Sequence, residues 1–333
     1  MTSNLERPFS SQYSRFKRLW NHGDRLWNWL ILGMAALVIL LVLAIGWQLW
    51  QESAAARGEF GWSFLLPKLD ATWNPVTNIY QAWPSIYGTL LTSLLAILLA
   101  VPISLGIAIF LAELCPPRLR LVLGWLVELL AAVPSVIYGL WGIFVFLPLV
   151  VTPVGNFLGA TLGTIPGLES LFKGPIPASG VSRLAASLIL AIMIIPTITA
   201  VSRDVFLAIP NSQREASLAL GATQWETIWQ VLLPYGLSGI LGAVILGLGR
   251  ALGETMAVTM VIGNSIESTG SLLRPGYTMA SIIANQFAEA VSVLHAQALV
   301  EVGLILFFLT LGLNILARFL VWRVARRTPQ EGR

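Results

Sequence analysis

The sequence has few of the residues that build disulfides, metal sites and most soluble active sites. It contains one cysteine, two histidines and three lysines among its 333 residues. A single cysteine, Cys115, excludes an intrachain disulfide and supplies no cluster of metal ligands. Neither His22 nor His295 has a second metal ligand at a suitable spacing. We therefore expect no metal site.

Charged residues are also scarce. Only 11% of the chain is charged, whereas 56% is hydrophobic and 13 residues are tryptophan. This composition is typical of a membrane protein. The net charge of +4 does not indicate nucleic-acid binding, because the basic residues gather beside the first and last apolar runs. In those places they set the orientation of a membrane protein.

Six apolar segments are long enough to cross a bilayer as helices. The first, 28–50, is longer than the apolar core of a signal peptide and follows an N-terminal tail, 1–27, so we interpret it as an anchor. A domain of residues 80–321 holds the rest, and 322–333 form a second tail. The spans of the domain 80–321 are expected at 88–112, 122–150, 184–209, 236–262 and 298–321. The sequence thus predicts an all-α polytopic membrane protein with six transmembrane helices.

Basic residues are more frequent on the side of the membrane that includes both termini. With the N-terminus inside, the loops 113–121 and 210–235 and the C-terminus share that side. The positive-inside rule then predicts cytoplasmic termini and an extracytoplasmic loop at 151–182. Glycine and proline predict irregular structure in this loop. Residues 277–297 are expected to include a short helix.

The stretch GLGRALGETMAV places Arg250 and Glu254 inside an apolar run. A charge at mid-membrane costs roughly 3 kcal/mol on insertion scales, so two charges need an explanation. In a continuous helix the two residues lie one turn apart on the same face. A guanidinium group suits a tetrahedral oxyanion, which favours a role in a substrate path or gate. The alternative is an ion pair that joins two helices and never meets a substrate.

Other polar residues in the spans are weaker candidates. Ser135 and Tyr138 follow Pro134, whose missing N–H opens the helix ladder, so they are candidates for lining a path. Helix bending and packing are the alternative explanation. Glu128 is expected to pair with an arginine or to extend toward the interface, and Glu301 is expected to stay hydrated.

The loop IPNSQREASLALGATQWETIWQVLLP carries the most local information. It holds two capping-box patterns, Ser212 with Glu215 and Thr223 with Glu226. Gly221 lies between them, where a helix end requires a left-handed residue. We predict two short helices joined by a sharp turn, with Pro234 starting the fifth span. Their apolar side chains fit either lipid headgroups or the groove of a partner protein.

This loop resembles the EAA loop of the permeases of ABC importers, E-A-A-x3-G-x9-I-x-L-P. The chain has Ser217 and Val231 where that motif has Ala and Ile. The resemblance implies the type I ABC importer permease fold and a loop that docks on an ATPase. The docking residues that it implies are Glu215, Ala216, Gly221, Leu233 and Pro234.

The chain has no phosphate-binding loop of the form G-x4-G-K-[ST]. An importer of this kind needs ATP, so the resemblance implies that ATP and Mg²⁺ bind to a separate ATPase subunit. We therefore expect a permease subunit without cofactor of its own, and not an enzyme.

Residues 129–149 and 247–264, with the run Arg-Ala-Leu-Gly-Glu-Thr-Met-Ala, resemble the C-type permease of the phosphate-specific branch of this family. This resemblance implies import of inorganic phosphate across a bacterial inner membrane. It also implies three partners: an A-type permease subunit, a dimeric ATPase and an extracytoplasmic phosphate-binding protein. Glu254 would accept a hydroxyl of phosphate, which sulfate lacks.

Three other functions stay open on the sequence alone. The chain fits a permease for another oxyanion, such as sulfate or molybdate. A secondary transporter or channel would use Arg250 and Glu254 for ion coupling, but it would not need the docking loop. An intramembrane enzyme is disfavoured because no nucleophile–base pair or metal motif occurs.

Overall fold

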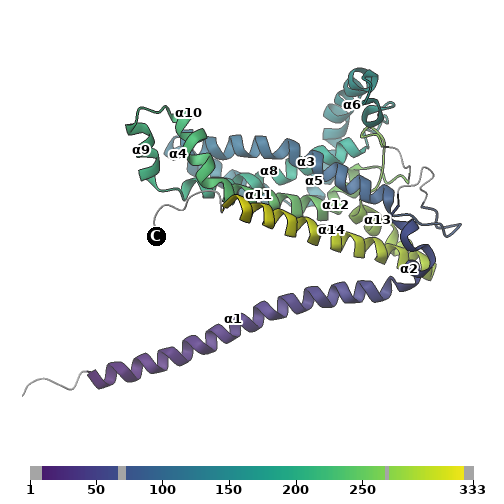
Figure 1. Cartoon of the computed structure of the whole chain (residues 1–333). Coiled ribbons are helices and arrows are strands. Elements are labelled where there is room, and N and C mark those ends of the chain that lie inside the picture. The colour runs from purple at the N-terminus through teal and green to yellow at the C-terminus, as the bar shows by residue number, and fades with distance from the viewer. Residues whose placement is uncertain (1–9, 67–72, 267–269, 326–333) are drawn as a thin grey trace, which may run out of the picture. The chain divides into compact units, whose positions relative to one another are not determined.

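The computed structural model describes residues 10–66, 73–266 and 270–325 (Figure 1). Within these ranges the backbone is helical apart from loops and two isolated β-bridges, which confirms the predicted all-α class. Residues 1–51 and 52–333 form two compact units, and each is taken by itself below. Of the two expected tails, residues 1–9 and 326–333 lie outside the described residues.

The first unit is almost entirely one helix, α1 (Ser10–Glu52). Its segment Trp27–Glu52 is long and apolar enough to span a membrane. Four tryptophans near the two ends of this segment have the positions that interfacial anchors take: Trp27, Trp29, Trp47 and Trp50. Because α1 begins at Ser10, much of the expected tail 1–27 continues the helix.

The second unit contributes five more segments that are long and apolar enough to span a membrane, so the described residues contain the predicted number of six. They are α3 (Trp83–Ile109) with a π-helix (Phe110–Leu114), α5 (Ser135–Trp141) with a π-helix (Gly142–Val151) and α6 (Thr152–Thr161), α8 (Arg183–Leu207), α10 (Gln224–Thr227) with a π-helix (Ile228–Leu232) and α11 (Leu233–Gly253), and α14 (Val293–Ala325). Figure 1 shows α3, α8, α11 and α14 running side by side.

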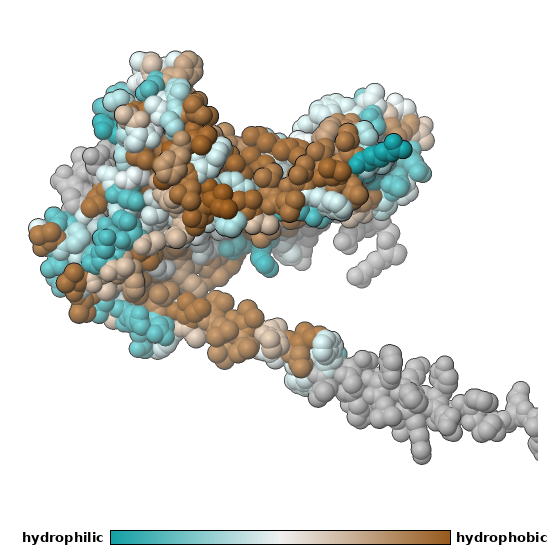
Figure 2. Space-filling model, turned by 180° about the vertical axis from the view of Figure 1, so that it is seen from behind, coloured by the Kyte–Doolittle hydropathy of each residue, from teal (hydrophilic) through white to brown (hydrophobic). Residues whose placement is uncertain are grey.

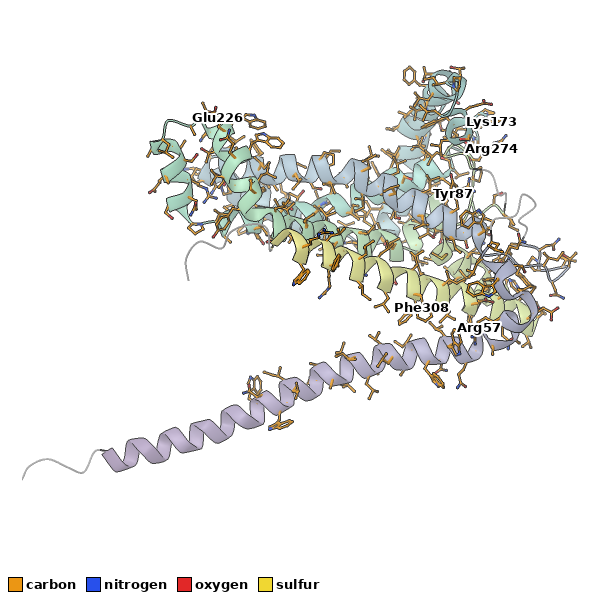
Figure 3. The ribbon with its side chains drawn as sticks, in the orientation of Figure 1. Arg57, Tyr87, Lys173, Glu226, Arg274 and Phe308 are labelled. Carbon is orange, nitrogen blue, oxygen red and sulfur yellow. The ribbon has the colours of Figure 1, made fainter. Side chains whose placement is uncertain are left out.

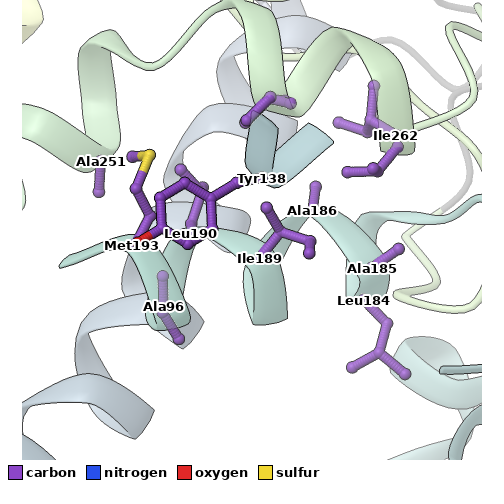
Figure 4. Close-up of a cluster of buried hydrophobic side chains, with 14 of the residues drawn as sticks. Ala96, Tyr138, Leu184, Ala185, Ala186, Ile189, Leu190, Met193, Ala251 and Ile262 are labelled. Atoms are coloured by element: carbon purple, nitrogen blue, oxygen red, sulfur yellow. The ribbon is translucent and has the colours of Figure 1, made fainter. Parts of the chain in front are cut away.

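Helix α8 is the centre of this unit. It packs against α3, α4 (Pro117–Ala131) and α11, and most of its side chains are buried. Small residues such as Ala185 and Ala186 let its neighbours approach closely, as is usual between membrane helices. Figure 4 shows the larger side chains of the same core, with Tyr138 beside Leu190 and Met193.

Apolar side chains cover much of the outer surface of the second unit. Figure 2 shows an apolar band across its middle and polar surface toward its ends. On α3, Leu94 and Leu98 are 66% and 67% exposed. Such a surface is stable in lipid, where apolar side chains need no burial in protein. The band therefore supports a membrane-spanning position for the helices.

Two of the expected continuous spans are interrupted. The span expected at 122–150 is divided, because α4 ends at Ala131 and α5 begins only after Pro134. The span expected at 236–262 is divided as well, because α11 ends at Gly253 and α12 covers only Met256–Val261. The two interruptions lie close together, since α5 packs on α12. A Cβ on Gly139 of α5 would lie 3.3 Å from the Cα of Ala257.

The end of the unit opposite α9 (Asn211–Ala219) carries α6, α7 (Glu169–Phe172) and α13 (Met279–Gln286). The expected irregular structure at 151–182 is wrong for the part that forms α6 and α7. Helix α6 continues without a break from α5 and the π-helix, so the helix of this span extends into the loop despite the glycines and prolines there. Helix α13 confirms the short helix expected within 277–297.

A buried polar cluster joins the segment before α3 to α13 and α14. The Trp73 indole N–H donates to Gln286 Oε1 over 2.6 Å, and His295 Nε2 lies 3.1 Å from the same oxygen. Tyr80 stacks on the His295 ring, with centroids 5.3 Å apart. Burial raises the pKa of the Tyr80 phenol above its ordinary value. One amide oxygen thus binds two buried rings, and Tyr80 packs against one of them.

Replacing Gln286 by leucine removes the acceptor shared by Trp73 and His295. A buried donor left without a partner costs about 1–3 kcal/mol, so we expect Gln286→Leu to unfold at a lower temperature than the unmodified protein in detergent. Gln230→Leu, a matched change at an exposed glutamine, should leave the unfolding temperature unchanged. Equal unfolding temperatures for both variants would contradict the role given to Gln286.

Candidate functional site

Arg250 lies in the last turn of α11 and is half-buried. Its Nη1 donates to Thr197 Oγ1 over 3.1 Å, on α8, and to the carbonyl oxygen of Ala131 over 3.4 Å, at the end of α4. Its Nε and Nη2 have no hydrogen-bond partner among the described residues. The protein therefore holds the guanidinium through Nη1 alone, and the N–H groups of Nε and Nη2 are not used by these residues.

Glu254 does not pair with Arg250. Within the described ranges, no ion pair joins Arg250 to any carboxylate. Because α11 ends at Gly253, Glu254 has an extended backbone, with ψ at 124°, and the expected helical spacing is lost. Its Oε1 instead accepts from the Ala257 N–H over 3.2 Å, in the first turn of α12. The expectation of one shared helix face was wrong.

Tyr138 and Arg250 meet the same helix end. The Tyr138 hydroxyl donates to the carbonyl oxygen of Leu130 over 2.9 Å, and Arg250 donates to the next carbonyl. The Leu130 carbonyl lacks its usual helical donor because that position is Pro134, which has no N–H. The two side chains thus supply donors to the last carbonyls of α4, which have lost their i+4 partners, and the Val133 N–H also donates to the Leu130 carbonyl, over 3.3 Å. The structure thus places Arg250 and Tyr138, two of the candidate path residues, on neighbouring carbonyls of one helix end.

Ser135 is the first residue of α5 and is half-buried. In the described part of the chain its hydroxyl makes no hydrogen bond. It lies next to Pro134 at the interruption between α4 and α5, so its position is compatible with a path residue. Thr197, which sequence reasoning missed, contacts Arg250 directly. Its only local signal was its place after Pro196.

The loop after α8 forms one short helix, α9, as predicted. The second short helix is not separate, because α10 continues through the π-helix into α11, and Pro234 lies within this continuous segment and does not start it. Gly221 lies between α9 and α10 with φ at +90°, the left-handed conformation expected of it. The predicted capping box of Thr223 and Glu226 is confirmed. The box predicted for Ser212 and Glu215 is wrong, because α9 begins at Asn211, directly after Pro210, and has no side-chain cap.

The implied docking residues lie on or next to these two helices. Glu215 and Ala216 are exposed on α9, whereas Leu233 and Pro234 form the first turn of α11. The hydroxyls of Ser217 and Thr227 are 2.9 Å apart and join α9 to α10. An open hollow of about 620 Å³ between the two helices is lined partly by Ala216 and Gly221.

Large apolar side chains on this loop point into solvent. Leu220 is 90% exposed, Trp225 60% and Trp229 53%, and the two indoles pack edge to face. Figure 3 places Glu226 at this end and Arg274 and Lys173 at the other. Exposed apolar groups of this size are typical of a surface that contacts another protein or a membrane.

The acidic residues of the spans behave differently from one another. Glu128 accepts from Arg203 Nη2 over 2.8 Å, which confirms that it pairs with an arginine. Glu301 is only 5% exposed, so the expectation that it stays hydrated is wrong. Sequence reasoning also missed Arg214 and Glu113, whose side chains pair over 2.7 Å although 101 positions separate them.

The chain belongs to the family described as binding-protein-dependent transport system inner membrane component, whose model matches residues 100–328. This family defines the class of the protein as an ABC importer permease. Among its relatives, the phosphate transport system permease protein PstC of Mesorhizobium japonicum is 47% identical over 88% of each chain. The protein of the same name from Pasteurella multocida is 47% identical over 90% of this chain and 91% of its own.

Solved structures support the same fold. A chain of the bacterial ABC transporter involved in import of the acidic polysaccharide alginate matches with a TM-score of 0.57 and 17% identity, covering 94% of this chain and 100% of its own. A chain of the inward-facing MetNI methionine ABC transporter matches with a TM-score of 0.52 and 19% identity, covering 72% of this chain and 94% of its own. The expected type I permease fold is confirmed.

Gly221 offers a test of the loop that is independent of transport. No atom lies within 4 Å of a Cβ added there, so the strain of Gly221→Ala comes from the backbone, at about 1 kcal/mol or more. We expect faster amide hydrogen exchange at 219–223 in this variant. Gly242 lies within α11, and a Cβ added there also meets no atom within 4 Å, but its backbone is helical. Gly242→Ala therefore has no such strain and should exchange like the unmodified chain. Unchanged exchange in Gly221→Ala would contradict the assigned conformation.

Proposed function

We propose that this chain is a permease subunit of an ATP-driven importer and that the importer carries inorganic phosphate. The observation that carries the proposal is the Arg250 side chain. It is held at the meeting point of α4, α8 and α11, and its Nε and Nη2 have no partner within the part of the chain that the structure describes. Two parallel N–H groups suit two oxygens of a tetrahedral oxyanion. The names of the relatives support phosphate as that oxyanion.

Glu254 gives the proposed site a preference among oxyanions. Its carboxylate is oriented by the Ala257 N–H and lies four positions beyond Arg250, across the end of α11. Phosphate carries at least one hydroxyl near neutral pH and donates a hydrogen bond to a carboxylate. Sulfate is fully ionised and meets only repulsion there. In this proposal Arg250 binds the anion and Glu254 discriminates against sulfate.

The proposed role of Tyr138 and Ser135 is to line the same path. Tyr138 shares the open helix end of α4 with Arg250, and Ser135 follows at the start of α5. Inside a membrane, interrupted helices are tolerated where they line a polar cavity or a binding site. The two neighbouring interruptions support a path at this position.

Three partners complete the proposed importer. The loop with Glu215, Ala216 and Gly221 docks on a dimeric ATPase, which binds ATP and Mg²⁺ in place of this chain. An A-type permease subunit completes the transmembrane path, and an extracytoplasmic binding protein delivers phosphate. A related alginate transporter was solved in complex with a ligand-bound periplasmic protein, which supports the last of these partners.

In the proposed orientation both termini and α9 face the cytoplasm of a bacterial inner membrane. Ser212 on α9 and Ser179 before α8 are both exposed, which makes them suitable reporters. In a Cys115→Ser background, we expect a cysteine at 179 to react with an impermeant thiol reagent added outside intact cells. A cysteine at 212 should react only after the membrane is opened. The reverse pattern would invert the orientation.

The substrate proposal predicts the effect of removing the free guanidinium. A hydrogen bond to a charged group contributes about 1.5–3 kcal/mol, so Arg250→Gln should lower phosphate uptake roughly 10- to 150-fold at equal protein level. Arg250→Lys keeps the charge but loses the two parallel N–H groups. Its phosphate uptake should lie between that of Arg250→Gln and that of the unmodified protein. Arg323→Gln, at an exposed arginine in the last turn of α14, should transport normally.

Substrate identity is tested by ATP hydrolysis in the reconstituted complex with its binding protein. Phosphate should stimulate hydrolysis, and sulfate should not. Glu254→Gln should weaken this discrimination, because a neutral amide no longer repels sulfate. Stimulation by sulfate or molybdate but not by phosphate would establish another oxyanion as the substrate and overturn the proposal.

A further inference from the structure

One arginine connects α9 to the rest of the molecule. Arg214 donates from Nε to both carboxylate oxygens of Glu113, over 3.2 and 3.1 Å, and from Nη2 to Oε1 over 2.7 Å. Glu113 lies in the π-helix that ends α3. This two-nitrogen geometry fixes the orientation of both side chains, unlike a contact through a single charged atom.

The same guanidinium also contacts the end of α8. Nη1 donates to the carbonyl oxygen of Ile209 over 2.6 Å, and Nη2 donates to that of Phe206 over 2.7 Å. These carbonyls belong to the last turn of α8 and the residues just after it, where helical donors run out. A cation at this end of a helix is also favoured by the helix dipole. Arg214 therefore binds α3, α8 and α9 at one point.

Little else holds α9 in place. None of its residues is fully buried, so apolar packing contributes little to its attachment. By contrast, the side chains of Arg214 and Glu113 are only 16% and 14% exposed. We call Glu113, Phe206, Ile209 and Arg214 the Arg214 cluster. Together with the Ser217–Thr227 contact, it accounts for the described polar attachment of α9.

Helix α8 continues from this cluster to Arg250. It carries Thr197, which accepts from Arg250, and Arg203, which pairs with Glu128 on α4. The last carbonyl of α4, that of Ala131, accepts from Arg250 as well. A displacement of α9 must therefore either break the Arg214 cluster or move two of the groups that position Arg250.

We propose that Arg214 and Glu113 are positioning residues that couple movement of α9 to the Arg250 site. This inference rests on the proposed function, because it assigns to α9 the contact with the ATPase. Neither residue contacts the substrate. Their effect passes through α8 and α4, and loss of the Arg214 cluster leaves α9 free to follow the ATPase without moving Arg250.

The test uses the complete complex with its binding protein and compares Arg214→Gln, Glu113→Gln and the double variant. We expect normal assembly and basal ATP hydrolysis within twofold of the unmodified complex. Stimulation of hydrolysis by phosphate-loaded binding protein should fall at least tenfold. Maximal uptake should fall equally, with an unchanged half-saturating phosphate concentration. The double variant should be no worse than Arg214→Gln, because both changes remove one interaction.

Arg118→Gln is the matched control, since Arg118 is an exposed arginine at the same end of the unit. It should behave like the unmodified complex. Normal stimulation and uptake in Arg214→Gln would overturn the inference. Failure of that variant to assemble, or loss of basal hydrolysis, would also overturn it, because Arg214 would then support folding or docking alone.

A second measurement separates this inference from the choice of substrate. Met256 is 53% exposed just beyond the interruption that follows Arg250, so a cysteine there reports on the site. In a Cys115→Ser background, ATP should change its rate of thiol labelling at least threefold, and Arg214→Gln should abolish that change. If ATP alters labelling but phosphate never stimulates hydrolysis, the substrate is wrong and the coupling stands. An unchanged ATP effect in Arg214→Gln overturns the coupling.

Discussion

The helix break at Pro134, between α4 and α5, is the constraint on which the Arg250 site depends, because it leaves the last carbonyls of α4 without their i+4 donors. Lipid offers no donor to a free carbonyl, so a proline between two membrane helices obliges other groups to bind the open end of α4. Tyr138 and Arg250 do so. The arginine that binds this end is thereby fixed at the meeting of α4, α8 and α11, and its Nε and Nη2 make no hydrogen bond to the described residues. Arg250 thus both binds a carbonyl at the end of α4 and supplies the donors of the proposed binding site.

Helix α8 gives this arrangement its mechanical continuity. It is the most buried of the long helices, and its Ala and Ser residues let α3, α4 and α11 approach closely. Well-packed interiors deform little, so a displacement at one end is transmitted to the other. The polar contacts of α8 with α4 and α11, through Arg203 and Thr197, lie near its cytoplasmic end and its middle in the proposed orientation. The packing of α8 therefore helps to fix the position of Arg250, through Thr197.

Local signals in the sequence predicted what depends on neighbouring residues. Gly221 and the Thr223 box were predictable because a turn and a cap involve only a few adjacent positions. The apolar runs likewise predicted six spans. The sequence did not reveal that Gly253 ends α11, because α12 is equally apolar and the hydropathy stays continuous. The contacts of Arg214 with Glu113, and of Arg250 with Thr197, bring together residues far apart in the chain, which no local pattern encodes.

The exposed side chains of Leu220, Trp225 and Trp229 have a consequence for how the chain is made. Without a partner these groups stay exposed, and exposed apolar surfaces of this kind favour self-association. If the proposed ATPase covers the loop, a cell that makes this subunit in excess of that ATPase accumulates aggregation-prone copies. Balanced synthesis of the subunits, or rapid degradation of unassembled ones, is therefore a requirement that this surface places on the cell.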